Sequence, residues 1–471
     1  MSQTLQDRLK DYLAQLPPRS QAMLMRAFEG ALERGEDTAV ATFVLQALRK
    51  IVRGSDDGQP RSNDPVRLLF RPLEPFLIDG STHARPGQIR RSSLLPIWQW
   101  LLRDGAPEQA KAFEKLLASS EGSKGPQLEA AVRKLQLATA EAITKLTGPA
   151  AGGDRQRALS RVGQSSVAED LMPMGAVLQA REALDGLSSR LPSYLRAFGD
   201  TQMESVLVAL NVPSLQTPML LPFALSLVMQ RMSAPWQIIR LAIKVAASDD
   251  EIRVAAIPLG VAVTIALHDL SGLAVTLRAD IRRGHFANVA EHLKTLHDGV
   301  RGLRTELDLR SESTWGKQLT SIRAEISNAL QSEIDSVPGR VRRILRQRPD
   351  KDIVAGARID TADVDEVVAL IDFVAVCRTY ASELAINEVT LRTYSDLQQY
   401  VEQATEALVQ SLRGSDARAR AYRQMQVAAA IKFCDVLFGH DYASLISRAA
   451  ENALTGERKS SSERKPSSRA G

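Results

Sequence analysis

The sequence predicts an all-α protein: a multi-helical array with a buried apolar central core and coiled-coil-like antiparallel helical hairpins in the C-terminal half. Apolar residues recur at spacings of three and four along most of the 471 residues, which is the period of a helix. No alternating run is long enough to predict a strand of ordinary length. Two uncharged runs, 205–230 and 254–267, are typical of helices buried on every side.

Composition is that of a large globular protein. Apolar residues make up 44% of the chain and charged residues 24%, and its length allows about three domains. Only two cysteines occur, Cys377 and Cys434, which excludes a disulfide framework and a four-cysteine zinc site. The polar N-terminus lacks the apolar region of a secretory signal. We therefore expect a cytoplasmic protein, with a peripheral location at a membrane as the alternative.

The N-terminal part of the chain is expected to form two helical segments. Segment 1–53 shows three amphipathic helical patterns, and a linker rich in glycine, proline and acidic residues follows it. Segment 66–146 begins with an irregular, proline-broken stretch and continues as helices, two of which start at Pro107 and Pro126, the favoured first position. Residues 147–165, rich in glycine, alanine and arginine, are predicted to be a flexible connection.

Segment 166–284 holds both uncharged runs and is the predicted apolar core. The first run is long enough to cross a membrane, but Pro213, Pro218 and Pro222 interrupt it. Extending the second run to membrane-spanning length would place Asp269 inside the bilayer, at a cost of about 2.5–3.5 kcal/mol. The sequence thus favours a protein core here and leaves contact with lipid as an alternative.

Segment 285–346 is predicted to be a coiled-coil-like hairpin. Its first helix has a seam of apolar residues stepping by three and four, formed by Phe286, Val289, Leu293, Leu296, Val300, Leu303 and Leu307. Gly299 and Gly302 are expected to weaken this helix by about 1 kcal/mol each. A second helix starts near Trp315 and is predicted to end before Pro338. The heptads could pair within one chain or between two copies as a homo-oligomer.

Segment 360–455 is predicted to hold the C-terminal helices, capped near Asp360 or Thr361 and interrupted at Gly439. The basic tail, 456–471, has little to bury and is expected to be disordered. Its three serines at 460–462 could be phosphorylated or could simply solvate the tail.

Known catalytic and cofactor motifs are missing from the sequence. It contains no phosphate-binding glycine loop, dinucleotide fingerprint, zincin helix, nucleophile elbow or CxxC pair, so we expect no cofactor. Two His-Asp dipeptides, His268-Asp269 and His440-Asp441, are weak metal candidates, more typical of surface or core-edge residues. Three further histidines, His285, His292 and His297, lack the spacing of three or four that a metal pair on one helical face needs.

Basic charge is concentrated in two short segments. The tail and residues 338–348 together carry a formal charge of +8, whereas the whole chain carries +5, so the remainder is slightly acidic. A narrow apolar stripe in 338–348 is surrounded by five arginines: Arg340, Arg342, Arg343, Arg346 and Arg348. Such a helix suits an acidic protein or an anionic membrane surface, or is simply a solvated helix end. No aromatic residue lies among the arginines to stack on bases, which disfavours nucleic acid.

Trp98 and Trp100, with the proline-broken run from Phe70 to Ile78, could line a groove for a peptide, although simple core packing explains them better. The pattern as a whole favours a non-catalytic helical scaffold or adaptor that binds another protein through exposed helical faces. A peripheral membrane protein that uses the arginine-rich helix and the uncharged segments is the first alternative. A helical enzyme of unrecognised type is the second.

Overall fold

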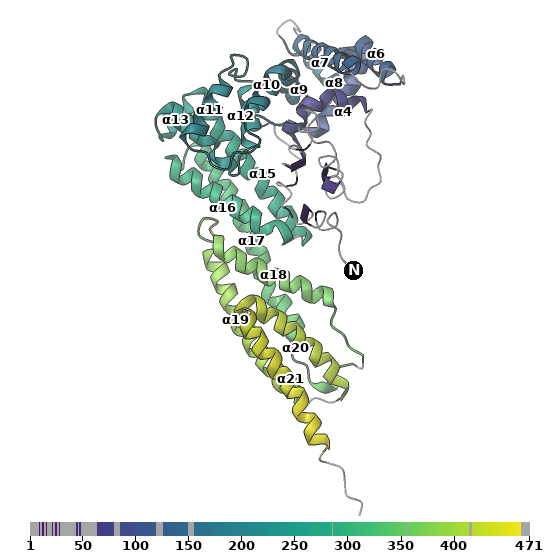
Figure 1. Ribbon diagram of the computed structural model, residues 1–471, viewed down its shortest axis with the longest axis vertical. Coiled ribbons are helices and arrows are strands. Elements are labelled where there is room, and N and C mark those ends of the chain that lie inside the picture. Colours follow the sequence, from purple (N-terminus) through teal and green to yellow (C-terminus); the bar gives the residue numbers. More distant parts are fainter. Residues whose placement is uncertain are drawn as a thin grey trace, which may run out of the picture. The chain divides into compact units, whose positions relative to one another are not determined.

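A computed structural model gives the fold (Figure 1). Besides twelve isolated residues before position 64, it describes 64–79, 85–118, 126–148, 155–284, 286–354, 356–413 and 417–462. The described chain is almost entirely helical, as the sequence predicts. It divides into two compact units: unit 1 comprises 1–269 and 302–315, and unit 2 comprises 270–301 and 316–471.

Unit 1 is built from short and medium helices with one very small sheet (Figure 1). Its first elements are α4 (Pro65–Phe70), η1 (Arg71–Phe76), β1 (Leu77–Ile78), β2 (Ile89–Arg90), η2 (Arg91–Ser93), α5 (Leu94–Trp100), the π-helical turn η3 (Leu101–Gly105), α6 (Pro107–Ala118) and α7 (Pro126–Thr147). Then come α8 (Arg155–Val162), α9 (Ser165–Gln179), α10 (Arg181–Arg190), α11 (Asp200–Leu210), α12 (Leu221–Met229), η5 (Pro235–Ile238), α13 (Ile239–Ala246), α14 (Glu251–Ala255) and η6 (Pro258–Gly260).

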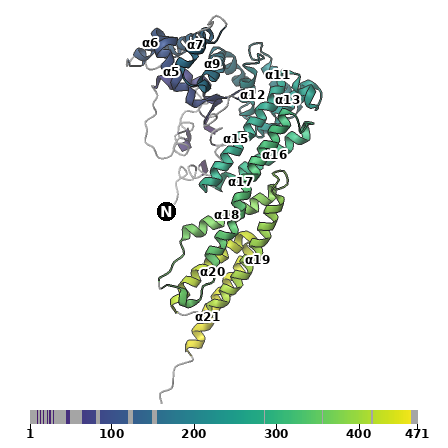
Figure 2. The ribbon, with the colours of Figure 1, turned by 180° about the vertical axis from the view of Figure 1, so that it is seen from behind.

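Three long helices have residues in both units, namely α15 (Val261–Arg283), α16 (Val289–Glu306) and α17 (Thr314–Leu345). The other elements of unit 2 are η7 (Phe286–Asn288), η8 (Asp350–Asp352), α18 (Thr361–Tyr380), α19 (Asn387–Leu412), α20 (Ala417–Phe438) and α21 (His440–Ser462). Helices α18 to α21 pack as a bundle, in which α19, α20 and α21 lie side by side in both views (Figures 1 and 2).

Local chemistry explains several boundaries that the sequence predicts. Helices α6 and α7 begin at Pro107 and Pro126, where the missing proline N–H costs no hydrogen bond. Asp360 caps α18 by accepting a 2.9 Å hydrogen bond from the backbone N–H of Ala362. Gly439 separates α20 from α21 with a φ of 90°, a left-handed conformation that glycine adopts without strain.

Three stretches expected to be irregular, flexible or disordered contain regular structure. Residues 155–162 form helix α8 inside the predicted connection 147–165, so that prediction is wrong there. In the proline-broken stretch, Asp64 caps the short helix α4, and Leu77 pairs with Ile89 in a two-residue parallel ladder. Helix α21 also continues to Ser462, past Gly456, where the disordered tail is predicted to begin. Helix α8 packs against α5, α7 and α9, contacts that composition alone does not indicate.

The predicted core is buried only in part: residues 221–229 of the first uncharged run form α12 inside unit 1, whereas most of 211–218 is exposed, so this run is not one helix buried on every side. All nine residues of α12 are buried, and the Phe223 ring meets the Phe76 ring edge to face at 4.9 Å between centroids. Trp98 and Trp100 are each only 5% exposed, so they belong to the packed interior and do not line a peptide groove. One described helix, at Pro258–Arg283, is long and apolar enough to cross a membrane, and the mean hydropathy of its most apolar stretch is 1.6. Because 44% of that stretch is buried within the protein, the helix equally fits the core of a protein without a membrane.

Pro338 does not end its helix, contrary to the sequence prediction. Helix α17 runs through the proline, and Ile334, Val337 and Val341 keep its buried face continuous on both sides. A proline inside a helix costs about 3 kcal/mol because it removes one hydrogen bond and crowds the preceding turn. The burial of this apolar face offsets that cost, a tertiary effect that the local sequence does not reveal.

The apolar seam of α16 is buried, and its two glycines serve close packing. A Cβ atom on Gly302 would lie 2.4 Å from the Trp236 ring, and one on Gly299 would lie 2.5 Å from Leu270 Cδ2. The absence of side chains at these two glycines lets Trp236 and Leu270 pack against the helix backbone. The expected loss of helix stability does not include this favourable packing. The pairing of α16 and α17 as an antiparallel hairpin, and of two copies through the heptads, stays a prediction.

The three helices predicted in segment 1–53 lie mostly outside the described residues. Of the residues that are described there, Leu13, Val44, Ala47 and Leu48 form a small buried apolar cluster. The segment therefore contributes at least one packed apolar cluster.

Candidate functional site

The five arginines predicted as a contact surface lie at the C-terminal end of α17 and just beyond it. Arg340 is half-buried and forms ion pairs with Glu366 on α18 and with Glu333, the latter at 3.4 Å. Arg342 is exposed, and its guanidinium carbon lies 5.4 Å from the centre of the Tyr400 ring. Partial burial raises the pKa of the Tyr400 hydroxyl, against the opposing effect of Arg342. These two arginines thus already have contacts within unit 2.

The other three, Arg343, Arg346 and Arg348, are exposed to solvent. No described residue forms an ion pair with any of them. Arg343 lies in the last turn of α17, and Arg346 and Arg348 follow Leu345, the last residue of the helix. Cations at a helix C-terminus interact favourably with the helix dipole. The end of α17 therefore presents positive charge that no described carboxylate pairs.

The apolar stripe of this segment is not available to a membrane. Val341, Ile344 and Leu345 are at most 7% exposed and pack inside unit 2. An amphipathic helix that lies in a lipid interface needs its apolar face for the acyl chains. Contact with a partner at this helix end must therefore come from the charged side chains.

Helix α20 holds the end of α17 in place. Gln426 donates hydrogen bonds from its side-chain amide to the backbone oxygens of Ile344 at 2.9 Å and Arg346 at 3.0 Å. The Ile344 carbonyl belongs to the last turn of α17 and the Arg346 carbonyl follows it, so no N–H of the helix reaches either oxygen. The arginines therefore stand on a rigid support.

Arg423 of α20 completes this support, although its side chain is only 8% exposed. Its guanidinium donates at 3.0 Å to the Asp350 carboxylate, to the Ser411 hydroxyl and to the backbone oxygen of Arg348. One side chain thereby joins the ends of α17 and α19 to the start of α20. We refer to Arg343, Arg346 and Arg348 on this support as the arginine surface.

The two His-Asp dipeptides have different environments. His268 is partly buried in unit 1, and burial, with the positive charge of Arg85, lowers its pKa to about 4. His440 belongs to unit 2, where its side chain is 88% exposed and lies 3.3 Å from Asp435. Among the described residues, no group of three or more histidine, cysteine or acidic side chains could hold a metal ion.

The histidines of the heptad segment have structural neighbours. His292 lies 3.5 Å from Asp280, and the His297 ring packs against the Tyr380 ring at 5.3 Å between centroids. His285 lies outside the described residues. None of the described contacts gathers these side chains into a catalytic arrangement.

Sequence reasoning missed the buried ion pairs. In unit 1, Arg90 donates to both Asp170 oxygens, at 2.9 and 3.1 Å, and Ser93 donates to Asp170 at 2.6 Å. Arg90 and Asp170 are separated by 80 positions, as Arg423 and Asp350 are by 73. No local pattern marks pairs so distant, and only the apolar residues around each one hint at its burial.

Comparisons with protein families, curated proteins and solved structures give no match to this chain. Any function has therefore to be argued from the residues described above.

Proposed function

We propose that the protein is a non-catalytic helical scaffold that binds an acidic protein partner through the arginine surface. The single observation that supports this most is the exposure of three arginines without intramolecular carboxylates on a helix end fixed by Arg423 and Gln426. Guanidinium groups suit carboxylates because each planar group can donate paired hydrogen bonds.

An anionic membrane surface is the competing partner. Its support is the same positive charge, together with the length and apolar composition of the helix Pro258–Arg283. The burial of Val341, Ile344 and Leu345 argues against it, since those residues would have supplied the apolar half of an interfacial helix.

Charge reversal tests the proposal directly. We expect the triple variant Arg343→Glu, Arg346→Glu, Arg348→Glu to lose its partners in quantitative affinity purification from the native cell, by tenfold or more. A matched control changes the same net charge at exposed arginines of unit 2 outside this surface: Arg283→Glu, Arg301→Glu, Arg448→Glu. Partner recovery that is equal for the two triple variants would contradict the proposal.

Vesicle flotation distinguishes binding to an anionic membrane from binding to an acidic protein. The purified wild-type protein is mixed with vesicles containing phosphatidylserine and with neutral vesicles, at low and at high salt. We expect no flotation with either, because charge alone without an apolar face gives weak, salt-sensitive attachment. Flotation with anionic vesicles that the arginine-surface variant abolishes, with protein partners unchanged, would favour the membrane alternative over the scaffold.

A further inference from the structure

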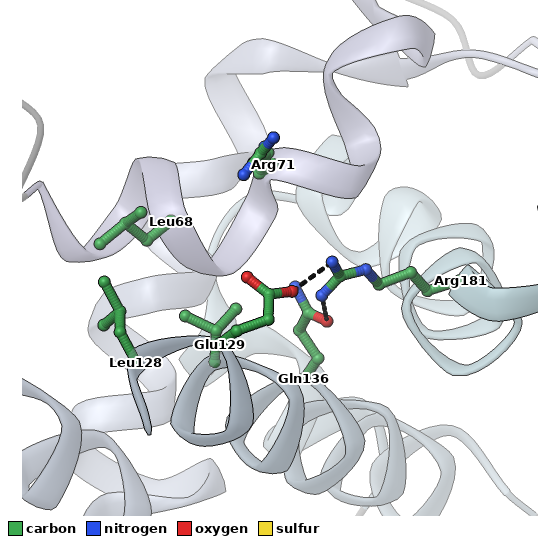
Figure 3. A pocket seen from close by; sticks show the side chains of 7 residues that line it. Leu68, Arg71, Leu128, Glu129, Gln136 and Arg181 are labelled. Atoms are coloured by element: carbon green, nitrogen blue, oxygen red, sulfur yellow. Dashed lines mark hydrogen bonds and ion pairs between the residues drawn. The ribbon is translucent and has the colours of Figure 1, made fainter. Parts of the chain in front are cut away.

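A cavity of about 190 Å³ lies in unit 1 between α4 with the start of η1, α7 and α10, and its charged lining residues already have partners (Figure 3). Arg181 forms an ion pair with Glu129 and donates at 3.1 Å to the side-chain oxygen of Gln136. Arg71, on the opposite side, also has an interaction within the chain. The arginine surface of unit 2 differs, because no described carboxylate pairs with its three guanidinium groups. Its unmatched charge therefore offers more to a ligand.

The last turns of α21 lie at the same end of the unit 2 bundle as the arginine surface. Arg423, near the start of α20, donates to the backbone oxygen of Arg348. A single residue, Gly439, joins α20 to α21, and the two helices pack side by side, so they run in opposite directions (Figures 1 and 2). Helix α20 rises about 22 Å from Arg423 to Phe438, whereas α21 rises about 33 Å along its length, so α21 passes the level of the arginine surface by about 10 Å.

This end of α21 carries a run of three serines among basic residues. The helix ends at Ser462, the last serine of the run 460–462. The basic residues on either side of the run are Arg458, Lys459, Arg464 and Lys465. Five basic and two acidic residues give 456–471 a formal charge of +3, so the unmodified segment is repelled by the arginine surface.

We propose that 460–462 is a phosphorylation site and that its phosphorylated form folds back onto the arginine surface. In the modification, a serine hydroxyl oxygen attacks the γ-phosphorus of ATP, the bond from that phosphorus to the bridging oxygen of ADP breaks, and the hydroxyl proton passes to a base of the protein kinase. The flanking cations suit a kinase with an acidic substrate groove. Each phosphate adds a charge of about −1.5 to −2, so three of them change the +3 of this segment to about −1.5 to −3.

Phosphates at this position both release the segment and give it a place to bind. Negative charge at a helix C-terminus opposes the helix dipole, so phosphorylation unwinds the last turns of α21. Once unwound, 456–462 spans up to about 25 Å, more than twice the distance of about 10 Å by which α21 passes the arginine surface. There each phosphate accepts paired hydrogen bonds from a guanidinium group.

The docked segment occupies the surface assigned above to the acidic partner, so phosphorylation regulates partner binding. In this respect the inference rests on the proposed function. A tethered segment acts at an effective concentration of about 1 mM, so a dissociation constant of about 0.1 mM for the docked segment lowers the partner affinity about tenfold.

Peptide binding to the purified full chain tests the docking with no partner present. A fluorescent peptide of sequence 456–471, with phosphoserine at 460, 461 and 462, is titrated with protein whose own tail is unphosphorylated, and its anisotropy is followed. We expect a dissociation constant of about 0.1 mM or lower, at least tenfold below that of the unphosphorylated peptide, and weaker binding at high salt.

Two triple variants locate this binding. Arg343→Glu, Arg346→Glu, Arg348→Glu should weaken it tenfold or more, whereas the charge-matched control variant defined above should leave it unchanged. The docking is disproved if both variants weaken binding equally, or if the phosphopeptide binds no more tightly than the unphosphorylated peptide. Because the experiment contains no partner, its failure is distinct from a failure of the proposed function.

Phosphosite mapping tests the modification itself. The purified full chain is incubated with ATP and a soluble extract of the native cell, and the phosphorylated positions are identified by mass spectrometry. We expect phosphate within 460–462, and its loss in the variant Ser460→Ala, Ser461→Ala, Ser462→Ala. Phosphate found only at other positions, or none at all, would overturn the assignment of the site.

Discussion

Arg90 in unit 1 and Arg423 in unit 2 are both buried guanidinium groups that join segments distant in sequence, yet their surroundings differ. The Asp170 side chain that faces Arg90 is 2% exposed; Ser93 donates a hydrogen bond to Asp170, and Glu169 forms a second ion pair with Arg90. The Asp350 side chain that faces Arg423 is 31% exposed, and a hydroxyl and a backbone oxygen take the remaining bonds. Unit 1 thus neutralises its buried arginine in the interior, whereas unit 2 does so at its edge, beside arginines that it leaves without carboxylates.

The largest effect is expected for the pair in unit 1. Asp170→Ala would leave Arg90 and the Ser93 hydroxyl buried without their acceptor, and we expect a loss of about 3–5 kcal/mol in the free energy of unfolding. All four tryptophans, Trp98, Trp100, Trp236 and Trp315, belong to unit 1, so their fluorescence during denaturant titration reports on this unit.

Glu169→Ala is the matched control for this change. Glu169 also pairs with Arg90, but its side chain is 50% exposed, so its loss should cost less than about 1 kcal/mol. If both alanine variants shifted the fluorescence midpoint by the same amount, the assignment of Asp170 as the main buried partner would be wrong.

A smaller effect is expected for the pair in unit 2. Asp350→Ala should cost about 1–3 kcal/mol, because Arg423 keeps two acceptors and its surroundings are closer to water. Since unit 2 contains no tryptophan, loss of helical circular dichroism is the measurement, with the fluorescence transition as an internal comparison. A shift of the fluorescence midpoint as large as that of Asp170→Ala would show that the two units do not differ as described.

Two glycines of α16, Gly302 in unit 1 and Gly299 in unit 2, allow the packing of the two units to be compared. Gly302→Ala would push a methyl group against the Trp236 ring, and we expect a net destabilisation of about 1–2 kcal/mol in spite of alanine's better helix propensity. Gly299→Ala meets the end of the flexible Leu270 side chain, which can move aside, and should cost less. Thermal unfolding of both is compared with Gly272→Ala, whose Cβ would meet nothing within 4 Å and which should stabilise α15 by about 0.5–1 kcal/mol. Stabilisation by Gly302→Ala would refute the close packing against Trp236.

The smallest effect concerns pH. The pKa of His268 is about 4 in the folded chain and about 6.5 when unfolded, so the unfolded chain binds a proton more readily. The stability contributed by the neutral ring is complete above pH 6.5 and is lost as the pH falls toward 4. Because the ring is only partly buried, we expect His268→Gln to reduce this loss by about 1–2 kcal/mol. The exposed control His440→Gln should leave the pH profile of unfolding unchanged, and identical profiles for all three proteins would contradict the prediction.

Features with a local cause were predictable from the sequence. Pro107, Pro126, Asp360 and Gly439 mark helix ends because each acts through its own backbone or its nearest neighbours. The all-α class and the burial of the α16 seam follow from the spacing of apolar residues in the same way.

Features that depend on distant residues were not predictable. Helix α17 continues through Pro338 because its buried face is covered on both sides of the proline, and α8 forms inside an apparent linker. The arginines were found as a pattern, but the burial of their apolar stripe and the bonds from Arg423 and Gln426 come from helix α20. The cavity lined by Arg71, Glu129 and Arg181 is formed by helices far apart in the chain, so no local motif predicts it.

The two natural cysteines are poorly reactive toward thiol reagents in the folded protein. Cys377 and Cys434 are both fully buried, and burial raises the pKa of each thiol above its usual value, which keeps both in the unreactive protonated form. A single cysteine introduced at an exposed position, such as Arg346→Cys, would therefore be the preferred target of a maleimide dye or spin label in the native protein. Site-specific spectroscopy of the arginine surface can thus begin from the natural chain, without first replacing its own thiols.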